Sequence, residues 1–274
     1  DQRPLTVAEG VDAGRSLGLG LRPGAADQLR AASLPLYGET QIETPHLDRL
    51  AAGGIRFTHA YSQPLCTPTR VQIMTGKYNH RNWLYFGILD PDERTFGHLM
   101  QDAGYATVIA GKWQLGKFDE CPNQPVEHGF DEYCMWAYKH NLPEGVQHTG
   151  GWEGKPGVKT SRYWHPCIIK NHEVVLTKQE DFGPTIFTDF LCDFMERNVR
   201  VGKPFLAYYP MVAPHGTRQG HTTCPIYGAP GDMAGPKEDL PQRFRALNDY
   251  IDILVGRLEQ KAIDLGVMDK TVFI

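Results

Sequence analysis

The sequence predicts an α/β fold in which a mainly parallel central sheet is covered by helices on both faces. From Leu34 onward, short apolar runs of strand length alternate with longer segments of helical periodicity. Residues that start and stop helices separate the two kinds of segment. Such alternation is typical of a parallel sheet, because each connection between parallel strands carries a helix across one face. The 274 residues, of which 41% are hydrophobic, suffice for one large domain.

The first predicted elements surround Cys66. A helix is predicted over residues 45–52, between a Thr-Pro pair that suits its N-terminus and a Gly-Gly pair that ends it. Alternation over residues 55–61 predicts a strand that leads into the Cys66 loop. Proline at the first turn predicts another helix over residues 68–75, closed by a glycine.

A second group of elements follows residue 95. A helix capped by Thr95 precedes a short apolar strand over residues 106–110. Another buried strand is predicted over 205–209, and a last one opens at 272–274. The two helices between these strands are marked by apolar residues at helical spacing, and Gly266 ends the second. These residues are Ile186, Phe187, Phe190, Leu191, Phe194 and Met195, then Phe244, Leu247, Ile251, Leu254 and Leu258.

Two segments depart from this pattern. Residues 139–183 are polar and rich in Gly, Trp and His, which predicts a lid-like insertion with a hairpin around Asn171 and His172. Residues 1–33 contain neither an aromatic residue nor an isoleucine. They predict a disordered leader rich in Ala and Gly or, as a second hypothesis, a stretch translated out of frame. The predicted folded domain therefore covers residues 34–274.

Composition excludes several classes of protein. The net charge of −4 gives no reason to expect a nucleic-acid partner. No apolar run reaches the roughly 18 residues that a membrane-spanning helix needs. The six cysteines include no Cys-x-x-Cys pair, so the sequence predicts neither a zinc finger nor a disulfide framework.

The segment richest in chemistry is the pentapeptide Cys66-Thr67-Pro68-Thr69-Arg70. A cysteine at the entrance of a helix has its thiolate favoured by the helix dipole and by free backbone N–H groups. The same position suits a tetrahedral oxyanion such as sulfate or phosphate. Arg70 lies one helical turn later and can point back to the same anion. The plainer alternatives are a packed thiol and an ordinary surface arginine.

This pentapeptide resembles the signature of the formylglycine-dependent sulfatases, which are arylsulfatase-like enzymes. Three further segments resemble landmarks of that family in the same order: residues 44–58, residues 104–113 and residues 129–133. Pro214-His215 is another landmark of this kind. The resemblance runs from roughly Asp27 to the end of the chain. It implies the mixed α/β sandwich of the alkaline phosphatase superfamily, with residues 34–274 as an incomplete N-terminal catalytic domain.

The resemblance also implies a mechanism. A maturation enzyme would oxidise Cys66 to formylglycine (3-oxoalanine), whose hydrate carries two hydroxyl groups. One hydroxyl attacks sulfur and releases the alcohol, and the other then expels sulfate and restores the aldehyde. Arg70 would hold the diol, Lys112 would bind a sulfate oxygen, and His215 would contact the leaving oxygen. A divalent cation, Ca²⁺ by the resemblance, would neutralise the sulfate oxygens, with Asp27 and the modified Cys66 among its ligands.

Three features depart from the family pattern. Asp27 matches the first of two adjacent metal-binding aspartates, but the next residue is Gln28. Gln114, a further substrate-binding candidate, stands where a histidine often helps to expel sulfate, and glutamine cannot accept that proton. The strand at residues 272–274 leads, in the family, to an Asp-Asn metal pair that lies beyond this chain. The chain thus resembles a truncated sulfatase with an incomplete cation site.

The predicted function is hydrolysis of a sulfuric ester, either an aryl or a carbohydrate sulfate. A related phosphonate or phosphodiester hydrolase is an alternative, because tetrahedral anions of similar size fit the same site. An inactive anion- or glycan-binding relic is another. Aromatic and histidine side chains of the insertion are candidates for stacking on a sugar or aryl ring, or for packing the insertion itself: Trp152, Tyr163, Trp164 and His165. The resemblance implies a periplasmic or extracellular location.

Overall fold

The computed structural model describes residues 34–38, 41–57, 59, 61–116, 118, 121, 123–137, 162–178, 180–215 and 240–274, with side chains from residue 242 onward in the last range. The chain's first 33 residues, including Asp27, lie outside this set.

A five-stranded sheet forms the centre of the described part. Its middle strand β1 (Ala106–Lys112) pairs in parallel with β2 (Glu132–Trp136) and with β5 (Phe205–Tyr208). The strands β3 (Ile168–Lys170) and β4 (Glu173–Val175) continue the sheet beyond β2 in antiparallel pairing. Every residue of β1 is buried, because a strand inside a parallel sheet is covered on both faces. The predicted mixed, mainly parallel α/β class is confirmed.

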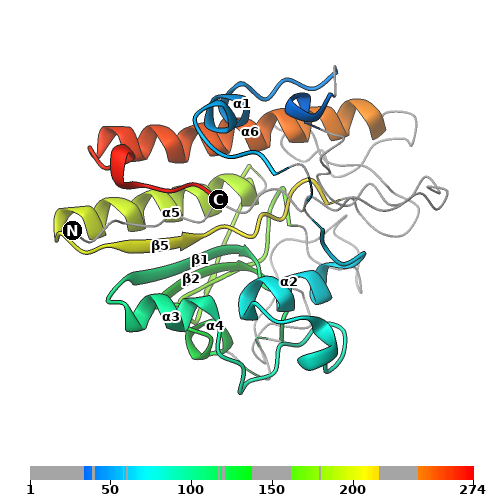
Figure 1. Ribbon diagram of the computed structural model, residues 1–274, viewed down its shortest axis with the longest axis vertical. Helices are drawn as coiled ribbons and strands as arrows, with labels where there is room; N and C mark the ends of the chain where they lie inside the picture. Colours follow the sequence, from blue (N-terminus) through cyan, green and yellow to red (C-terminus); the bar gives the residue numbers. More distant parts are fainter. Residues whose placement is uncertain are drawn as a thin grey trace.

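Helices cover both faces of this sheet (Figure 1). The helices α5 (Gly183–Arg200) and α6 (Leu240–Asp264) pack over one face, and α1 (Pro45–Ala52) lies on α6. The opposite face carries α2 (Cys66–Thr75), α3 (Phe96–Asp102) and α4 (Gln124–Glu127). Short 3-10 turns complete the elements: η2 (Pro35–Tyr37), η3 (Asn79–Arg81) and η7 (Met268–Lys270).

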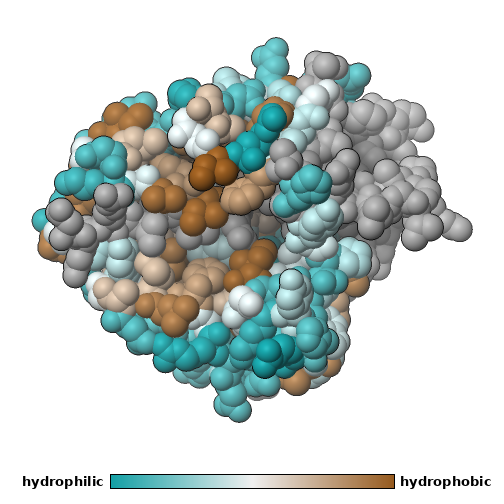
Figure 2. Space-filling model, in the orientation of Figure 1, coloured by the Kyte–Doolittle hydropathy of each residue, from teal (hydrophilic) through white to brown (hydrophobic). Residues whose placement is uncertain are grey.

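Two apolar cores result from the pleat of the strands. Val108 and Ala110 of β1 join the core under α5 and α6, whereas Ile109 joins the core on the α2–α3 side. This division follows from the period of two along a strand. Figure 2 shows apolar surface in the middle of the view, between the layer of α1 and α6 and the layer of α3. The lower margin of the molecule in this view is hydrophilic.

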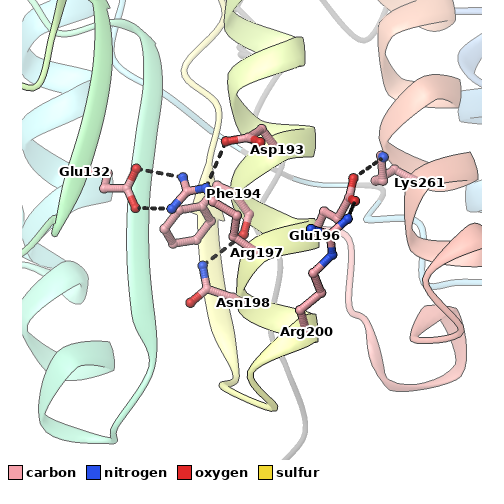
Figure 3. Close-up of polar contacts among 8 residues, drawn as sticks. All are labelled: Glu132, Asp193, Phe194, Glu196, Arg197, Asn198, Arg200 and Lys261. Atoms are coloured by element: carbon pink, nitrogen blue, oxygen red, sulfur yellow. Dashed lines mark hydrogen bonds and ion pairs between the residues drawn. The ribbon is translucent and has the colours of Figure 1, made fainter.

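Charged side chains tie α5 to its neighbours near the amino end of β2 (Figure 3). The Arg197 guanidinium donates to both carboxylate oxygens of Glu132 at 2.9 and 2.8 Å and to Asp193 at 2.9 Å. These carboxylates raise the pKa of Arg197, chiefly through the hydrogen bonds with Glu132. Lys261 of α6 donates to Glu196 at 3.1 Å. The network therefore fixes α5 at the sheet edge opposite the carboxyl ends of the parallel strands.

Several sequence expectations are confirmed and others are wrong. The predicted hairpin exists, with β3 and β4 joined through Asn171 and His172, both at positive φ. The described half of the insertion thus extends the main sheet, and its lid role stays a prediction. The described residues between 55 and 61 form no strand, and Ile55, Phe57 and Tyr61 are exposed. Residues 272–274 are likewise not paired in a strand with a described residue. An alternating or apolar run forms a strand only where a neighbouring strand supplies hydrogen-bond partners.

Candidate active site

Cys66 is the first residue of α2, two residues earlier than the proline-based prediction placed the helix start. The preceding residue, Leu65, is extended and makes no side-chain cap. The N-cap residue thus supplies no side-chain acceptor to the free N–H groups at the start of this ten-residue helix, where Cys66 stands. The Cys66 side chain is partly exposed, which leaves it accessible at this helix end.

Buried hydroxyl groups hold the first turn of α2 in place. Thr69 donates its hydroxyl to the Leu65 carbonyl at 2.8 Å and lies 3.1 Å from the Gln63 carbonyl. The Thr67 hydroxyl accepts from the Gly87 N–H at 3.2 Å. Asn79 donates its side-chain amide to the Pro68 carbonyl at 3.0 Å. The two threonines of the pentapeptide thus act as structural anchors, so the turn that carries Cys66 is fixed.

Gln114 approaches Cys66 from the loop after β1. The Cys66 Sγ donates to the Gln114 Oε1 over 3.5 Å. Gln114 has a φ of 50°, a left-handed backbone conformation that is uncommon outside glycine, asparagine and aspartate. The two residues are 48 positions apart in sequence, so this contact depends on the packing of α2 against the end of β1.

Arg70 connects α2 to the end of the same strand. Its Nη1 donates to the Lys112 carbonyl oxygen at 2.7 Å. Lys112 is the last residue of β1 and is only 4% exposed. Its side chain is therefore held in a region of reduced dielectric, where any charge interacts more strongly with its neighbours than it does in water. Cys66, Arg70, Lys112 and Gln114 thus lie together at the carboxyl edge of the sheet.

His215 lies in the loop after β5, whose carboxyl end meets that of β1 at the same edge. The Lys112 N–H donates to the Pro210 carbonyl at 2.8 Å, which extends the pairing of the two strands beyond the ladder. The Tyr163 hydroxyl lies 2.8 Å from the His215 carbonyl and 3.2 Å from the Val212 carbonyl. Tyr163 therefore positions the backbone of the His215 loop.

Burial decides between the two alternatives, stacking and packing, for Tyr163 and Trp164 of the insertion. Tyr163 and Trp164 are 2% and 3% exposed and pack with Phe182. They belong to the core and do not offer a ring to a sugar, because a stacking platform must be accessible. Trp152 lies outside the described residues. No sequence pattern indicates the contact of Tyr163 with His215, which joins residues 52 positions apart.

The cysteines of the described part differ in their surroundings. Burial raises the pKa of Cys134 and of Cys167 to about 12, and burial also raises the pKa of Cys192. Thiols with such values are almost fully protonated at neutral pH and therefore unreactive. Cys66 and Cys121 are partly exposed instead.

Within the described ranges, no group of three or more His, Cys, Asp or Glu side chains could hold a metal ion. Asp27, the predicted ligand, is not among these residues. The described residues on their own therefore do not fit a calcium site. A search of the same residues for long apolar helices finds none able to cross a bilayer.

Comparison with known proteins identifies the family of the chain. The family model described as "Sulfatase" matches residues 25–274. Arylsulfatase A of Bos taurus is 30% identical over 261 residues, which cover 90% of this chain and 49% of the relative. N-acetylgalactosamine-6-sulfatase of Homo sapiens is 29% identical over 272 residues, covering 89% and 47%.

A solved structure shares the fold of this chain. The solved structure described as "Crystal structure of Ps i-CgsB" superposes with a TM-score of 0.70 at 21% identity, over 99% of this chain and 57% of the other. This chain spans about half the length of the curated relatives that it matches. Because the family model covers nearly the whole described sequence, the chain belongs to the Sulfatase family.

Proposed function

We propose that this chain carries the part of an active site that holds the nucleophile for hydrolysis of sulfuric esters. Residue 66, converted to formylglycine, would be that nucleophile. The observation that supports this most is the position of Cys66. It begins α2 with a partly exposed side chain, 3.5 Å from Gln114, while Arg70 of the same helix is tied to Lys112. Family membership makes a sulfate ester the first substrate class to test.

The surroundings of Cys66 suit the modification. The hydrate of formylglycine needs room for two hydroxyl groups and a hydrogen-bond partner beside them. The partly exposed end of α2 offers the room, and the Gln114 amide offers a partner. When present, the formylglycine hydrate would supply a hydroxyl nucleophile that a thiol does not replace.

The remaining residues bind and orient. The Arg70 guanidinium, oriented by the Lys112 carbonyl, would hold the oxygens of residue 66 in place. The Lys112 ammonium would offset the charge of the sulfate oxygens from a buried position. His215, whose loop is held by Tyr163, would donate a proton toward the leaving alcohol oxygen. Gln114 would donate its amide N–H to a sulfate oxygen but cannot take up a proton in the release of sulfate.

The relatives guide the substrate class. One is described as an arylsulfatase and the other as a sulfatase of N-acetylgalactosamine 6-sulfate, so we infer an aryl or carbohydrate sulfate for this chain. A calcium ion bound near residue 66 is part of this proposal. Its ligands would have to include residues outside the described ranges, since those ranges hold no group of three or more His, Cys, Asp or Glu side chains suited to a metal ion.

Mass spectrometry of the Cys66 peptide tests the proposal. The full-length gene product would be expressed with and without a formylglycine-generating enzyme, with Cys66→Ala as the control. We expect conversion of the thiol to the aldehyde only in the co-expressed protein, together with turnover of an aryl sulfate. If Cys66 kept its thiol in protein co-expressed with an active converting enzyme, the proposal would be contradicted. That result would favour the alternative of an inactive anion- or glycan-binding protein.

The same protein separates the related hydrolases. Turnover of an aryl sulfate is compared with turnover of an aryl phosphodiester and an aryl phosphonate under identical conditions. A higher kcat/KM for the phosphorus esters would show that the site, although modified, belongs to a phosphonate or phosphodiester hydrolase.

A further inference from the structure

We propose that Arg162 is an additional substrate-binding residue of this site and that it binds a second anionic group of the substrate, a sulfate or carboxylate distinct from the ester that is cleaved. This inference rests on the proposed function, because it takes the carboxyl edge of the sheet as the place where substrate binds. It names the substrate class more narrowly, as a doubly anionic carbohydrate or aryl sulfate.

Arg162 lies over the ring of the last residue of a strand. Its guanidinium carbon lies 4.2 Å from the centre of the Trp136 ring. Trp136 ends β2 and is the register partner of Lys112, which ends β1. A guanidinium over an aromatic ring is attracted by the ring face, and this contact uses none of its N–H donors as hydrogen bonds.

Trp136 and Lys112 belong to the same side of the sheet. Trp136 and Ala110 are members of the core under α5 and α6, whereas Trp113 is a member of the opposite core. Because side chains alternate along a strand, Lys112 shares the side of Ala110 and Trp136. The cation of Arg162 therefore lies above a strand end that directly adjoins Lys112.

The guanidinium is not neutralised within the described part of the chain. Its Nη1 is buried and has no hydrogen-bond partner, and no ion pair with a described carboxylate exists. Other described arginines at the surface do have such partners: Arg49, Arg94, Arg197, Arg200 and Arg257. A buried charged donor without a partner is unfavourable, and an anion supplied by a ligand would satisfy it.

The backbone of Arg162 is fixed relative to the rest of the site. The next residue, Tyr163, contacts the His215 carbonyl through its hydroxyl. Gly183, the first residue of α5, lies directly against the Arg162 backbone. A Cβ added to Gly183 would lie only 2.3 Å from the Arg162 carbonyl oxygen. Arg162 is thus held over the end of β2, beside the strand end that carries Lys112, and is linked through Tyr163 to the loop that carries His215. Two oxygens of a carboxylate or of a sulfate group can accept hydrogen bonds from two N–H groups of one guanidinium.

The first experiment measures turnover by the full-length gene product co-expressed with the converting enzyme. The substrates are glucosamine N,6-disulfate and N-acetylglucosamine 6-sulfate, which differ in the second anion. We expect Arg162→Gln to raise KM for the disulfate about tenfold, with kcat within about twofold and the monosulfate nearly unaffected. Arg162→Lys should lie in between, since it keeps the charge but loses the planar donor pair.

Arg200→Gln is the matched control, because Arg200 lies on α5 in an exposed pair with Glu196. It should leave KM for both sugars unchanged. An equal rise of KM for both sugars in Arg162→Gln, or no rise for either, would overturn the role of Arg162. Thermal unfolding of each variant shows whether it is folded. If Arg162→Gln is not folded, the comparison of the two sugars is made with Arg162→Lys instead.

A second experiment separates this inference from the hydrolase proposal. Calorimetry compares benzene-1,3-disulfonate with benzenesulfonate, neither of which can be hydrolysed, on wild-type protein with or without the modification. We expect the disulfonate to bind at least about fivefold more tightly and the difference to vanish in Arg162→Gln. Equal binding of the two probes to wild-type protein would refute the second anion site even if sulfate esters are turned over.

Discussion

The Arg70 guanidinium donates to the carbonyl oxygen of Lys112 across 2.7 Å, although 42 residues separate them in sequence. This bond joins the helix that begins at Cys66 to the end of the central strand. The guanidinium is therefore held against the backbone of Lys112, and the position of this turn of α2 relative to the end of β1 depends on Arg70.

Removing this bond should loosen the site. Arg70→Ala is expected to lower the free energy of unfolding by about 2 kcal/mol, since a charged donor to a partly buried carbonyl is lost. Urea denaturation of the full chain measures this change. Arg70→Lys should recover part of the loss, because an ammonium reaches the same acceptor with one donor. Equal stability of wild type and the alanine variant would show that the bond contributes nothing.

Gly111 allows β1 and the strand extension after β5 to approach each other beside Lys112. Its φ is 121°, and a Cβ there would come within 2.3 Å of the Pro210 carbonyl oxygen. We expect Gly111→Ala to lower the free energy of unfolding by about 3 kcal/mol, because backbone must move. The control is Gly76→Ala, where φ is 66° and no atom lies within 4 Å of the added Cβ. Its expected cost is about 1 kcal/mol. A smaller loss for Gly111→Ala than for Gly76→Ala would contradict this account.

Gln114 is expected to limit the release of sulfate because it cannot accept a proton. In modified full-length protein, Gln114→His should raise kcat about tenfold above pH 7, where an imidazole is neutral and can act as a base. The gain should fade as the pH drops below about 6.5, where the imidazole is protonated. Gln114→Asn is the control, since asparagine tolerates the positive φ but accepts no proton. A pH-independent change in the histidine variant would exclude this role.

The pair of Glu259 and Arg49 should make stability depend on pH. The hydrogen bond from Arg49 lowers the pKa of Glu259 below its ordinary value of 4.5, so the pair stabilises the fold above that pH. Glu259→Gln is expected to cost about 1 kcal/mol at pH 7, and the difference from wild type should shrink as the pH falls below 4.5. Denaturation at several pH values measures it. The exposed pair of Asp102 and Arg94 is the control, and Asp102→Asn should cost less than about 0.5 kcal/mol.

Thiol labelling should distinguish the cysteines in protein made without the converting enzyme. At pH 8, Cys66 and Cys121 should react first, because their side chains are partly exposed. Cys134 and Cys167 should react last, since a pKa of about 12 leaves few thiolates at that pH. Peptide mass mapping over time reads the order, and labelling in urea shows that every site can react. Labelling of Cys134 as fast as Cys66 would contradict the burial of the Cys134 thiol in the core.

Local sequence features account for much of the fold and for part of the candidate site. The helix–strand alternation, the cap at Thr95 and the turn through Asn171 and His172 are decided by residues within a few positions of each other. The spacing of Cys66 and Arg70 belongs to the same class, because one helical turn places them together. The strand predicted at residues 55–61 fails, since its alternation says nothing about whether a partner strand is present.

The α/β class, the helix that starts beside Cys66 and the family resemblance of its pentapeptide can all be read from the order of the residues. Which distant residues share the carboxyl edge emerges only from the folded chain: Gln114 against Cys66, Tyr163 under the His215 loop and Arg162 over Trp136. The difference arises because caps and periodicity act over one or two turns of chain. Contacts between strand ends depend instead on strand order and register, which the packing of the whole sheet and its helices sets.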